Sequence, residues 1–553
     1  MRKLILLTGM LLSCLALMAQ YQFRVIDLNL GNGNGNSMYA TVYQDKLFMN
    51  ARTSGYDIEL FTSNGTLAGT QMFKDLNPGG NGSYPSAFVI CKGLLFFLAI
   101  TDADGMELWV SDGTAAGTHM VKDINPGPGG TETDRIGTGR PLLTVMGNKV
   151  YFMANDGVHG QELWMSDGTS AGTQMLKDIN PGSADAAPMY LTAYNNKLIF
   201  AAIDGVSGQE PWITDGTAAG TQRLKDIFTG AAHSLPSEFT VYKNRVYFGA
   251  KNSTNGFELW VSDGTTDGTK LFKDICPGQA QSGASGFFVS NDKMFFSAGC
   301  LGESGLELWV SDGTEVGTRM VKDIFPGPDF SAPQHFASYQ GKVFFAAKGS
   351  NATGTELWYS DGTDAGTKLV KDLAPGSGPS NPRALIVYKN KLYFIFSVGF
   401  LDEHLAVSDG TPAGTYQIAP PGANLPNPMQ FTQFVIYHDT LYFNAIFDAV
   451  YGHELWALTD TSVVTSGVGQ VTANTAFSMY PNPSDGQVTL QLKNTTGIAE
   501  VQVCDMTGRK VYDQTLPAGV ASNVLQLGHL PKGIYILRLQ QGTAWASERL
   551  VVR

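Results

Sequence analysis

The sequence predicts an all-β chain: a closed β-propeller of about nine four-stranded blades, with eight also possible, followed by a small C-terminal β-sandwich. Three observations predict it. One segment of the type ELWVSDGTAAGTHMVKDINPG (107–127) recurs along the chain, alternating apolar and polar runs separate its copies, and no stretch shows sustained helical periodicity. Gly is abundant, at 64 of 553 residues, and only 16% of residues are charged, which favours turns over long helices.

The repeat has a period of about 48 residues. Its ELW-type segments begin at Glu59, Glu107, Glu162, Glu210, Glu258, Glu307 and Glu356, with a degenerate copy at His404 and a truncated copy at Glu454. A hairpin-like run such as YKNRVYFGA (242–250) precedes each of them. Each unit therefore predicts four short strands with turns between them, the content of one propeller blade.

The DGTxxGT turn inside each unit has a local physical basis. Asp112 is expected to accept a hydrogen bond from a backbone amide two residues on. Gly113 and Gly117 are expected to take positive φ where the chain reverses. The turn is therefore predicted to be a structural hairpin.

The same hairpin predicts a register between its two strands. The expected opposite pairs are Ser111 with Thr118, Trp109 with Met120, and Glu107 with Lys122. The charge pair recurs as Glu162 with Lys177, Glu258 with Lys273, Glu307 with Lys322 and Glu356 with Lys371, and such pairs contribute roughly 0.2–1 kcal/mol each.

Two residue types of the repeat are predicted to be structural. The Trp, present in seven of nine copies, is expected to pack blade against blade. A recurring Asp is expected to satisfy backbone amides near a turn, at Asp27, Asp75, Asp123, Asp178, Asp226, Asp274, Asp323 and Asp372. The alternative is that these acids bind a ring of ions.

The two ends of the repeat region complement each other. The segment FRVIDLN (23–29) matches the KDI half of a unit, whereas the last ELW, at 454, has no KDI half after it. We therefore predict that the N-terminal strand joins the last hairpin and completes one blade, which removes the exposed sheet edges.

The N-terminus has the pattern of an export signal. Residues 1–19 combine Arg2 and Lys3 with an apolar run and end in Ala19, which predicts a secretory signal peptide. Cys14 leaves a lipoprotein as the alternative interpretation. No other segment is long and apolar enough to span a bilayer, so the mature chain is predicted to have no transmembrane segment.

Composition excludes some functions. The formal charge of -12 argues against a nucleic-acid partner, which needs clustered Lys and Arg. Cys91, Cys276, Cys300 and Cys504 show no metal spacing. Cys276 and Cys300 could pair, but isolated buried thiols are the favoured interpretation.

The repeat resembles that of the bacterial ELWxxDGT-repeat proteins over about residues 22 to 460, and we assign the propeller to 20–460. The resemblance implies a secreted repeat protein and brings no established reaction.

The C-terminal region differs in composition. Residues 461–476 are small and polar, a linker, and residues 477–553 alternate as short strands. Tyr480-Pro481-Asn482-Pro483, Asp505-Thr507-Gly508-Arg509, Leu530-Pro531-Lys532-Gly533 and the terminal Arg549–Arg553 resemble the sorting domain of type IX secretion cargo. The resemblance implies the type IX machinery as partner and a protein that is secreted, extracellular or anchored to the outer-membrane surface.

Function is predicted to lie on the face formed by the loops between the second and third strands and between blades, since these vary among copies while DGTxxGT does not. Loop 130–140, with Asp134, Arg135 and Arg140, is the most distinctive. DADG (102–105) is expected to be a polar turn rather than a calcium loop, and His159 to be solvent-exposed.

No nucleophile elbow, zinc signature or phosphate loop occurs, and no pair of acids stands out from the repeat. We therefore predict no enzyme, no catalytic, cofactor-binding or metal-binding residue, and no cofactor. The favoured function is a non-catalytic propeller that binds a glycan or protein. A structural surface component and a propeller enzyme acting on polysaccharide are the alternatives.

Overall fold

A computed structural model gives the three-dimensional structure of the chain. It describes residues 20–29, 33–52, 57–79, 81–131, 142–300, 302–376, 378–399, 402–423, 433–447, 451–461, 477–480, 484, 486–492, 499–505, 510–528, 530–541 and 544–552. The chain divides into two compact units, Met1–Ser462 and Val463–Arg553. The predicted signal peptide (1–19) and all but the first residue of the predicted linker lie outside the described residues.

The first unit consists of four-stranded antiparallel sheets, nine of them in the described residues. Sheets 1 to 3 are β2 (Met38–Tyr43), β3 (Lys46–Ala51), β4 (Glu59–Ser63), β5 (Thr70–Lys74); β6 (Ser86–Cys91), β7 (Leu94–Thr101), β8 (Gly105–Ser111), β9 (His119–Met120); and β10 (Leu143–Met146), β11 (Lys149–Asn155), β12 (Gln161–Ser166), β13 (Gln174–Lys177). Sheets 4 to 6 are β14 (Met189–Tyr194), β15 (Lys197–Ile203), β16 (Gln209–Thr214), β17 (Gln222–Arg223); β18 (Ser237–Tyr242), β19 (Arg245–Asn252), β20 (Gly256–Ser262), β21 (Lys270–Lys273); and β22 (Ser285–Ser290), β23 (Lys293–Ala298), β24 (Glu307–Ser311), β25 (Arg319–Lys322).

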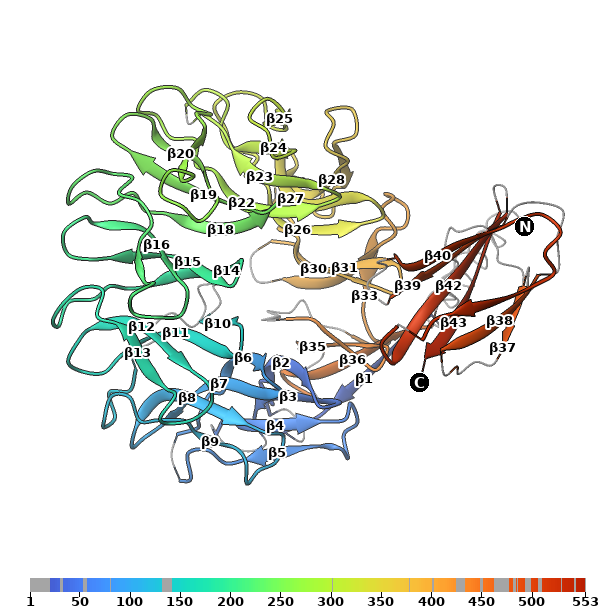
Figure 1. The fold of residues 1–553 in the computed structure, drawn as a ribbon, viewed down its shortest axis with the longest axis horizontal. Coiled ribbons are helices and arrows are strands. Elements are labelled where there is room, and N and C mark those ends of the chain that lie inside the picture. Colours follow the sequence, from blue (N-terminus) through green and yellow to red (C-terminus); the bar gives the residue numbers. More distant parts are fainter. Residues whose placement is uncertain are drawn as a thin grey trace. The chain divides into compact units, whose positions relative to one another are not determined.

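Sheets 7 and 8 are β26 (Gln334–Tyr339), β27 (Lys342–Ser350), β28 (Gly354–Ser360), β29 (Lys368–Lys371); and β30 (Arg383–Tyr388), β31 (Lys391–Ser397), β32 (Glu403–Ser408), β33 (Tyr416–Ile418). Sheet 9 is β34 (Val435–Tyr437), β35 (Thr440–Ala445), β36 (Glu454–Asp460) and β1 (Tyr21–Ile26). The sheets follow one another around a common centre, with the first strand of each nearest that centre (Figure 1). This all-β arrangement of four-stranded sheets fits a β-propeller, as predicted.

Sheet 9 combines the two ends of the unit. β1 runs antiparallel to β36 over six residue pairs, from Tyr21 opposite Asp460 to Ile26 opposite Leu455. The Leu28 amide, just after β1, donates a hydrogen bond to Glu454 Oε2 at 2.8 Å. The predicted pairing of the N-terminal strand with the last hairpin is therefore confirmed.

The core lies between neighbouring sheets. Trp164 of sheet 3 packs in one cluster with Phe96, Leu108 and Val110 of sheet 2 and is 5% exposed. The same contact recurs for Trp109, Trp212, Trp260 and Trp456 with the sheets before them. The predicted role of the Trp as an inter-sheet packing residue is confirmed.

Tyrosine hydroxyls add a polar link between sheets. The last residue of the first strand is Tyr in most sheets, and its hydroxyl donates to a backbone carbonyl in the first hairpin turn of the next sheet. The bonds are Tyr43 to Gly93, Tyr194 to Asn244, Tyr242 to Asp292, Tyr339 to Asn390, Tyr388 to Asp439 and Tyr437 to Asp45. The last of these joins sheet 9 to sheet 1, so the two terminal sheets contact each other as other neighbours do.

One cysteine interpretation is wrong. Cys276, which follows β21, forms a disulfide with Cys300, which follows β23, while Cys91 and Cys504 are free and buried. The two partners come from consecutive repeats and have different repeat positions, so the repeat pattern gives no sign of their contact. The bond ties the segment after sheet 5 to the loop between β23 and β24 of sheet 6.

The second unit has two sheets around one core. The first contains β37 (Phe477–Tyr480), β38 (Gln487–Leu492) and β41 (Ser522–Gln526). The second contains β40 (Lys510–Leu516), β39 (Ala499–Cys504), β42 (Gly533–Gln541) and β43 (Ala544–Val552). Leu490 and Leu525 from the first sheet share an apolar cluster with Val501 and Leu537 from the second. This is the predicted β-sandwich.

No part of the described chain forms a helix that is long and apolar enough to cross a membrane.

Candidate functional site

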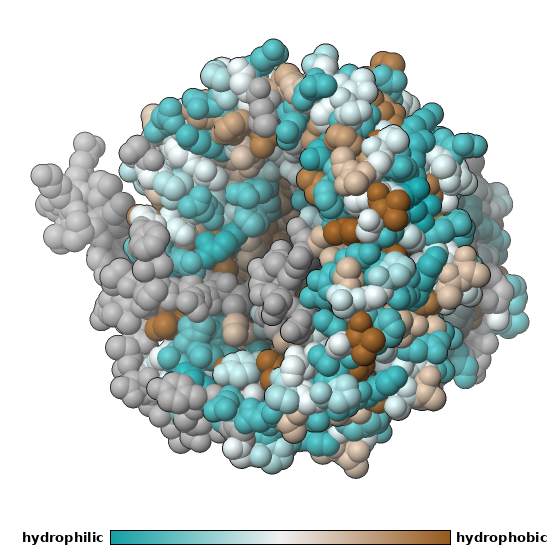
Figure 2. All heavy atoms as spheres, turned by 90° about the vertical axis from the view of Figure 1, so that its left-hand side faces the viewer, coloured by the Kyte–Doolittle hydropathy of each residue, from teal (hydrophilic) through white to brown (hydrophobic). Residues whose placement is uncertain are grey.

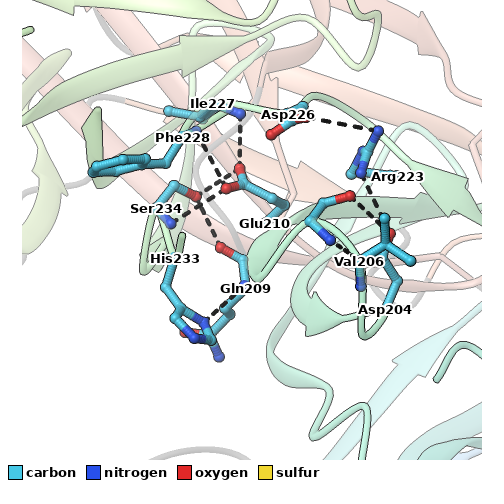
Figure 3. A network of polar contacts seen from close by, with 11 residues as sticks. Asp204, Val206, Gln209, Glu210, Arg223, Asp226, Ile227, Phe228, His233 and Ser234 are labelled. Carbon is cyan, nitrogen blue, oxygen red and sulfur yellow. Dashed lines mark hydrogen bonds and ion pairs between the residues drawn. The ribbon is translucent and has the colours of Figure 1, made fainter. Parts of the chain in front are cut away.

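The glutamate of each ELW segment holds the scaffold together. Glu210, in β16, is completely buried. Its Oε2 accepts hydrogen bonds from the Ile227 amide at 2.8 Å and the Ser234 hydroxyl at 2.7 Å, and its Oε1 accepts the amides of Phe228 and Ser234 (Figure 3). Burial raises the pKa of Glu210 to about 7, although these donors favour the ionised form.

The same network recurs in other sheets. In five of them the buried ELW glutamate accepts a hydrogen bond from the backbone amide of the residue seventeen positions later. These glutamates are Glu59, Glu162, Glu258, Glu307 and Glu356. Burial raises the pKa of each to about 7, and that of Glu107 to about 8. These acids bind the chain's own backbone, so they are scaffold groups.

The predicted Glu–Lys cross-strand pairs are wrong. A register shift between Leu163 and Trp164 places Lys177 opposite Leu163, and the same shift recurs in sheets 1, 5, 6 and 7. The Lys177 ammonium instead donates to the Thr221 carbonyl of the next sheet at 2.7 Å. Lys122 and Lys371 likewise reach Thr173 and Thr415 of their following sheets, so the lysine connects neighbouring sheets.

The KDI aspartates do not behave as predicted. One buried oxygen, Oδ1, has no hydrogen-bond partner in Asp27, Asp75, Asp123, Asp178, Asp226, Asp274 and Asp372. The backbone amide of the residue after the aspartate binds the ELW glutamate instead, for instance at Leu76, Ile179 and Ile227. Across the described residues, no three His, Cys, Asp or Glu side chains are arranged to hold a metal ion.

In the DGTxxGT turn the predicted Asx-type hydrogen bond is present, and the predicted backbone conformation is right for one glycine and wrong for the other. Asp112 Oδ1 accepts the Thr114 amide at 2.8 Å and the Thr114 hydroxyl at 2.7 Å. Gly113 has φ of 90°, as predicted. Gly117 does not have positive φ; a Cβ there would lie 2.1 Å from the Asp112 carboxylate, so close approach explains this glycine.

The predicted register of the turn is confirmed for two of its three pairs. Trp109 lies opposite Met120, and the hydroxyls of Ser111 and Thr118 are 2.7 Å apart. The hydroxyl pair recurs in every other sheet with a complete turn, for instance between Ser262 and Thr269.

The loops between second and third strands differ from sheet to sheet. In sheet 3, the His159 ring lies 2.7 Å from the Asp156 carboxylate, which raises the pKa of the imidazole. The predicted exposure of His159 is borne out only in part, since its side chain is 36% exposed. Val158 and Val206, in the equivalent loops of sheets 3 and 4, are 63% and 74% exposed. Single exposed apolar residues are normal on protein surfaces, and Val316 in a DGTxxGT turn is even more exposed, so these two valines do not by themselves mark a binding surface.

The DADG segment is a polar turn, as predicted. The Thr101 hydroxyl donates to Asp104 Oδ2 at 2.9 Å, and the Asp102 amide donates to Asn77 Oδ1 at 3.0 Å. Asp134, Arg135 and Arg140 of the distinctive loop lie outside the described residues.

On the side of the molecule that Figure 2 shows, hydrophobic side chains form small separate patches between hydrophilic residues.

The inner strands carry a repeated feature that the sequence analysis missed. In seven sheets, a bulge interrupts the pairing of the first strand with the second. The residue that opens the bulge has a left-handed backbone, with φ of 53–68°, and five residue types occur at the seven positions: Tyr39, Ala87, Tyr190, Glu238, Gly286, His335 and Ala384. Bulges redirect side chains, and a left-handed non-glycine residue inside a strand, outside a hairpin turn, is uncommon.

A small pocket opens beside one of these positions. It is lined by Ser37, Met38, Tyr39 and Ala40 of sheet 1 and by Gln433, Val435, Tyr442, Phe443, Asn444 and Leu455 of sheet 9. It therefore lies where the two ends of the repeat region meet. No signal in the sequence marks it, because its residues are near each other only through the pairing of distant strands.

The C-terminal unit has relatives in sequence. Residues 478–553 match the family described as the secretion system C-terminal sorting domain. These residues are a type IX sorting domain. The sorting domain implies secretion, with the type IX machinery as its partner, and an outer-membrane or extracellular location. A search of curated proteins finds no match to the chain.

Solved structures similar to the chain are distant. They include a puromycin hydrolase (13% identity, TM-score 0.33, 66% of this chain and 58% of that chain) and a puromycin-hydrolyzing peptidase of Mycobacterium tuberculosis (10%, 0.33, 67% and 60%). A third is the β-propeller domain of the Trilobed protease from Pyrococcus furiosus (12%, 0.32, 61% and 98%). The chain spans about three fifths of the length of the first two, and at these TM-scores the likeness says nothing about activity.

Proposed function

We propose that this chain is a secreted, non-catalytic binding protein whose repeat region closes into a nine-bladed propeller and recognises a glycan or a protein. The sorting domain would deliver it through the type IX system to the cell surface or the medium. Closure is supported by two contacts. β1 pairs with β36 as the fourth strand of sheet 9, and the Tyr437 hydroxyl donates to the Asp45 carbonyl of sheet 1, a bond that recurs between other neighbouring sheets.

One observation carries the binding role. The scaffold residues of the repeat are the same in most sheets, whereas the left-handed bulge residue of the inner strand varies among copies, as at Tyr190, Glu238 and His335. A position with constant backbone geometry and changing chemistry is what a recognition surface built on a rigid repeat requires.

The acids of the repeat support a non-catalytic role. Glu210 and its counterparts are occupied by backbone amides and recur in most sheets, so they form no distinct pair of carboxylates that could act as acid and base. The alternative function, a structural surface component, would not require particular side chains on the inner strands.

The test is a binding screen of the chain from Gln20 to Arg553 against a glycan array and a panel of extracellular proteins. We expect a specific ligand whose binding falls at least tenfold in a Tyr190→Ala, Glu238→Ala double variant. The control is Val316→Ala, at a 93% exposed site in a DGTxxGT turn, which should bind normally. Absence of any ligand for a folded protein would contradict the proposal.

A further inference from the structure

We infer that Asn64 is a self-modifying residue: the backbone nitrogen of Gly65 attacks its side-chain amide, and the turn matures to the Asp-Gly form that its counterparts carry. The modification adds one negative charge where the two ends of the repeat region meet. It needs no ligand, so the inference is independent of the proposed binding function.

Asn64 is the exception among the second hairpin turns. The turn of sheet 1 reads SNGTLAGT (63–70), whereas the turns of sheets 2 to 8 all have DGT at the same positions. Because glycine has no Cβ, the nitrogen of an Asn-Gly peptide bond can approach the preceding side chain with little hindrance. Asn64 is exposed, so water reaches its side chain.

The hydrogen bonds of the turn activate the Asn64 amide. Its Oδ1 accepts the Thr66 backbone amide at 3.1 Å and the Thr66 hydroxyl at 2.7 Å. Two donors on one carbonyl oxygen stabilise the oxyanion that forms when a nucleophile adds to the carbon. The bond to the Thr66 amide also closes a ring that contains Cγ of Asn64 and the nitrogen of Gly65, so the side chain folds over the peptide that attacks it.

A hydroxyl contacts the attacking nitrogen. The Gly65 amide donates to Ser63 Oγ at 2.9 Å. The Thr70 hydroxyl donates to the Thr66 carbonyl at 2.6 Å, so the Ser63 hydroxyl, 2.6 Å from Thr70 Oγ1, donates its own proton to Thr70. Ser63 Oγ is therefore an acceptor toward Gly65 and is placed to take the amide proton as the nitrogen attacks.

The reaction has two steps. A bond forms between the Gly65 nitrogen and Asn64 Cγ, the side-chain nitrogen leaves as ammonia with the proton that the Gly65 nitrogen gives up, and a succinimide ring remains. One water molecule then cleaves the bond between Cγ and the ring nitrogen and leaves aspartate at position 64. Cleavage of the other imide bond would lengthen the main chain inside a turn whose ends, Ser63 and Thr70, are paired. We therefore expect aspartate to exceed isoaspartate.

The neighbouring turns show why the reaction stops at aspartate. Asp112 Oδ1 accepts the same two bonds from Thr114, and these bonds, that of the hydroxyl first, hold the pKa of Asp112 below its usual range. An ionised carboxylate is a poor electrophile, so the Asp-Gly turns do not cyclise. The same bonds become charge-assisted and stronger once position 64 is ionised.

The turn lies at the contact between the ends of the repeat region. The Gly65 carbonyl accepts the guanidinium of Arg24, in β1, at 2.5 Å and the hydroxyl of Tyr442, in β35, at 3.4 Å. A carboxylate at position 64 is one residue from this contact and opposite in charge to Arg24. We therefore expect the modification to strengthen the attachment of β1 and sheet 9 to sheet 1, and salt to weaken the gain.

Other asparagines that precede glycine provide the comparison. In the described chain these are Asn34, Asn81 and Asn255, and none has two donors on its side-chain oxygen. Asn255 Nδ2 donates to the Asp274 carboxylate at 2.8 Å. That bond opposes loss of the nitrogen, which must gain a proton to leave.

The experiment follows conversion by peptide mass spectrometry in the folded chain from Gln20 to Arg553 at mildly alkaline pH. Tryptic peptide 53–74 contains Asn64 as its only asparagine. We expect Asn64 to convert at least about tenfold faster than Asn255, because a single oxyanion donor commonly contributes more than that. Thr66→Val, which removes one donor, should slow conversion, whereas Leu67→Ala, at a half-exposed site of the same turn, should not.

Unfolding in urea separates the effect of the structure from that of the Asn-Gly sequence. The unfolded chain should convert Asn64 and Asn255 at similar rates. Equal rates in the folded chain, or faster conversion of Asn64 in urea than in the folded chain, would overturn the inference. Isoaspartate as the main product would overturn the return to the repeat sequence.

Asn64→Asp supplies the product directly and tests its effect on the contact between the ends. This variant should unfold at a higher urea concentration than freshly prepared natural protein. Arg24→Gln in both backgrounds should remove more than half of the difference. A midpoint equal to or below that of the natural protein would reject the stabilising effect of the modification.

Discussion

The pairing of the N-terminal strand with sheet 9 predicts the effect of a matched pair of substitutions. Leu28 and Ile227 occupy the same position of the repeat, just after the fourth strand, in sheets 9 and 4. Each is 7% exposed, and each donates its amide to the ELW glutamate of its sheet at 2.8 Å. If β1 stabilises its sheet as any other fourth strand does, truncating either side chain lowers the free energy of unfolding by the same amount.

The expected cost follows from burial. Removing a buried Leu or Ile side chain beyond Cβ typically destabilises a protein by about 2–5 kcal/mol, through lost transfer energy and the cavity left behind. Leu28 packs with Leu47 and Met49 of sheet 1 and with Leu455 of sheet 9, so its cavity lies at the seam between the ends. We expect Leu28→Ala and Ile227→Ala each to lower the free energy of unfolding by about 3 kcal/mol.

The assay is urea unfolding followed by tryptophan fluorescence on the chain from Gln20 to Arg553. With a slope of about 3 kcal/mol/M, each variant should unfold at about 1 M less urea than the natural protein. A Leu28→Ala midpoint that shifts by less than a quarter of the Ile227→Ala shift would refute the reasoning. It would show that β1 contributes little to the stability of the unit.

Three further predictions concern the disulfide and the polar network. Replacing Cys276 and Cys300 together by Ser should lower the free energy of unfolding by about 3 kcal/mol, the loop-closure contribution expected for partners 24 residues apart. Dithiothreitol should lower the melting temperature of the natural protein by the same amount as the double substitution does. An unchanged melting temperature would show that the disulfide adds no stability. Glu210→Gln should lower the free energy of unfolding by about 2–4 kcal/mol at pH 7, because one amide oxygen cannot replace two carboxylate oxygens that accept four hydrogen bonds. A loss of less than about 1 kcal/mol by calorimetry would contradict this account. The buried ELW glutamates have pKa values near 7 when folded and about 4.3 when unfolded, so the unfolded chain ionises first as pH rises. Their contribution is therefore fully present below about pH 4, and urea midpoints should fall between about pH 5 and 8; midpoints that rise over this range would overturn the assignment.

The repeat made much of the fold predictable. Constant spacing, turn residues and alternating runs indicated the strands, the DGTxxGT bond at Asp112 and the partner of β1. The Glu162–Lys177 pairing failed because a bulge after the ELW leucine shifts the register by one residue, and nothing local in the sequence marks that shift. The carboxylate is then free to accept amides seventeen residues later.

The candidate site was less predictable for a different reason. The left-handed residues of the inner strands include Tyr39, Glu238 and His335, whose identities differ although they share one backbone conformation. That conformation is imposed by the bulge and by packing around it.

The pairing of β1 with β36 also bears on how fast the chain can fold. Leu28 and Glu454 are joined across 426 residues, so the contact forms only after nearly the whole unit has been synthesised. Sheets 1 to 8 are each built from a continuous segment and can form early, whereas sheet 9 must bring the two ends together against the entropy of a very long loop. Until then β1 and β36 both present unpaired edges, so a chain interrupted before residue 454 keeps a strand that can pair with another molecule.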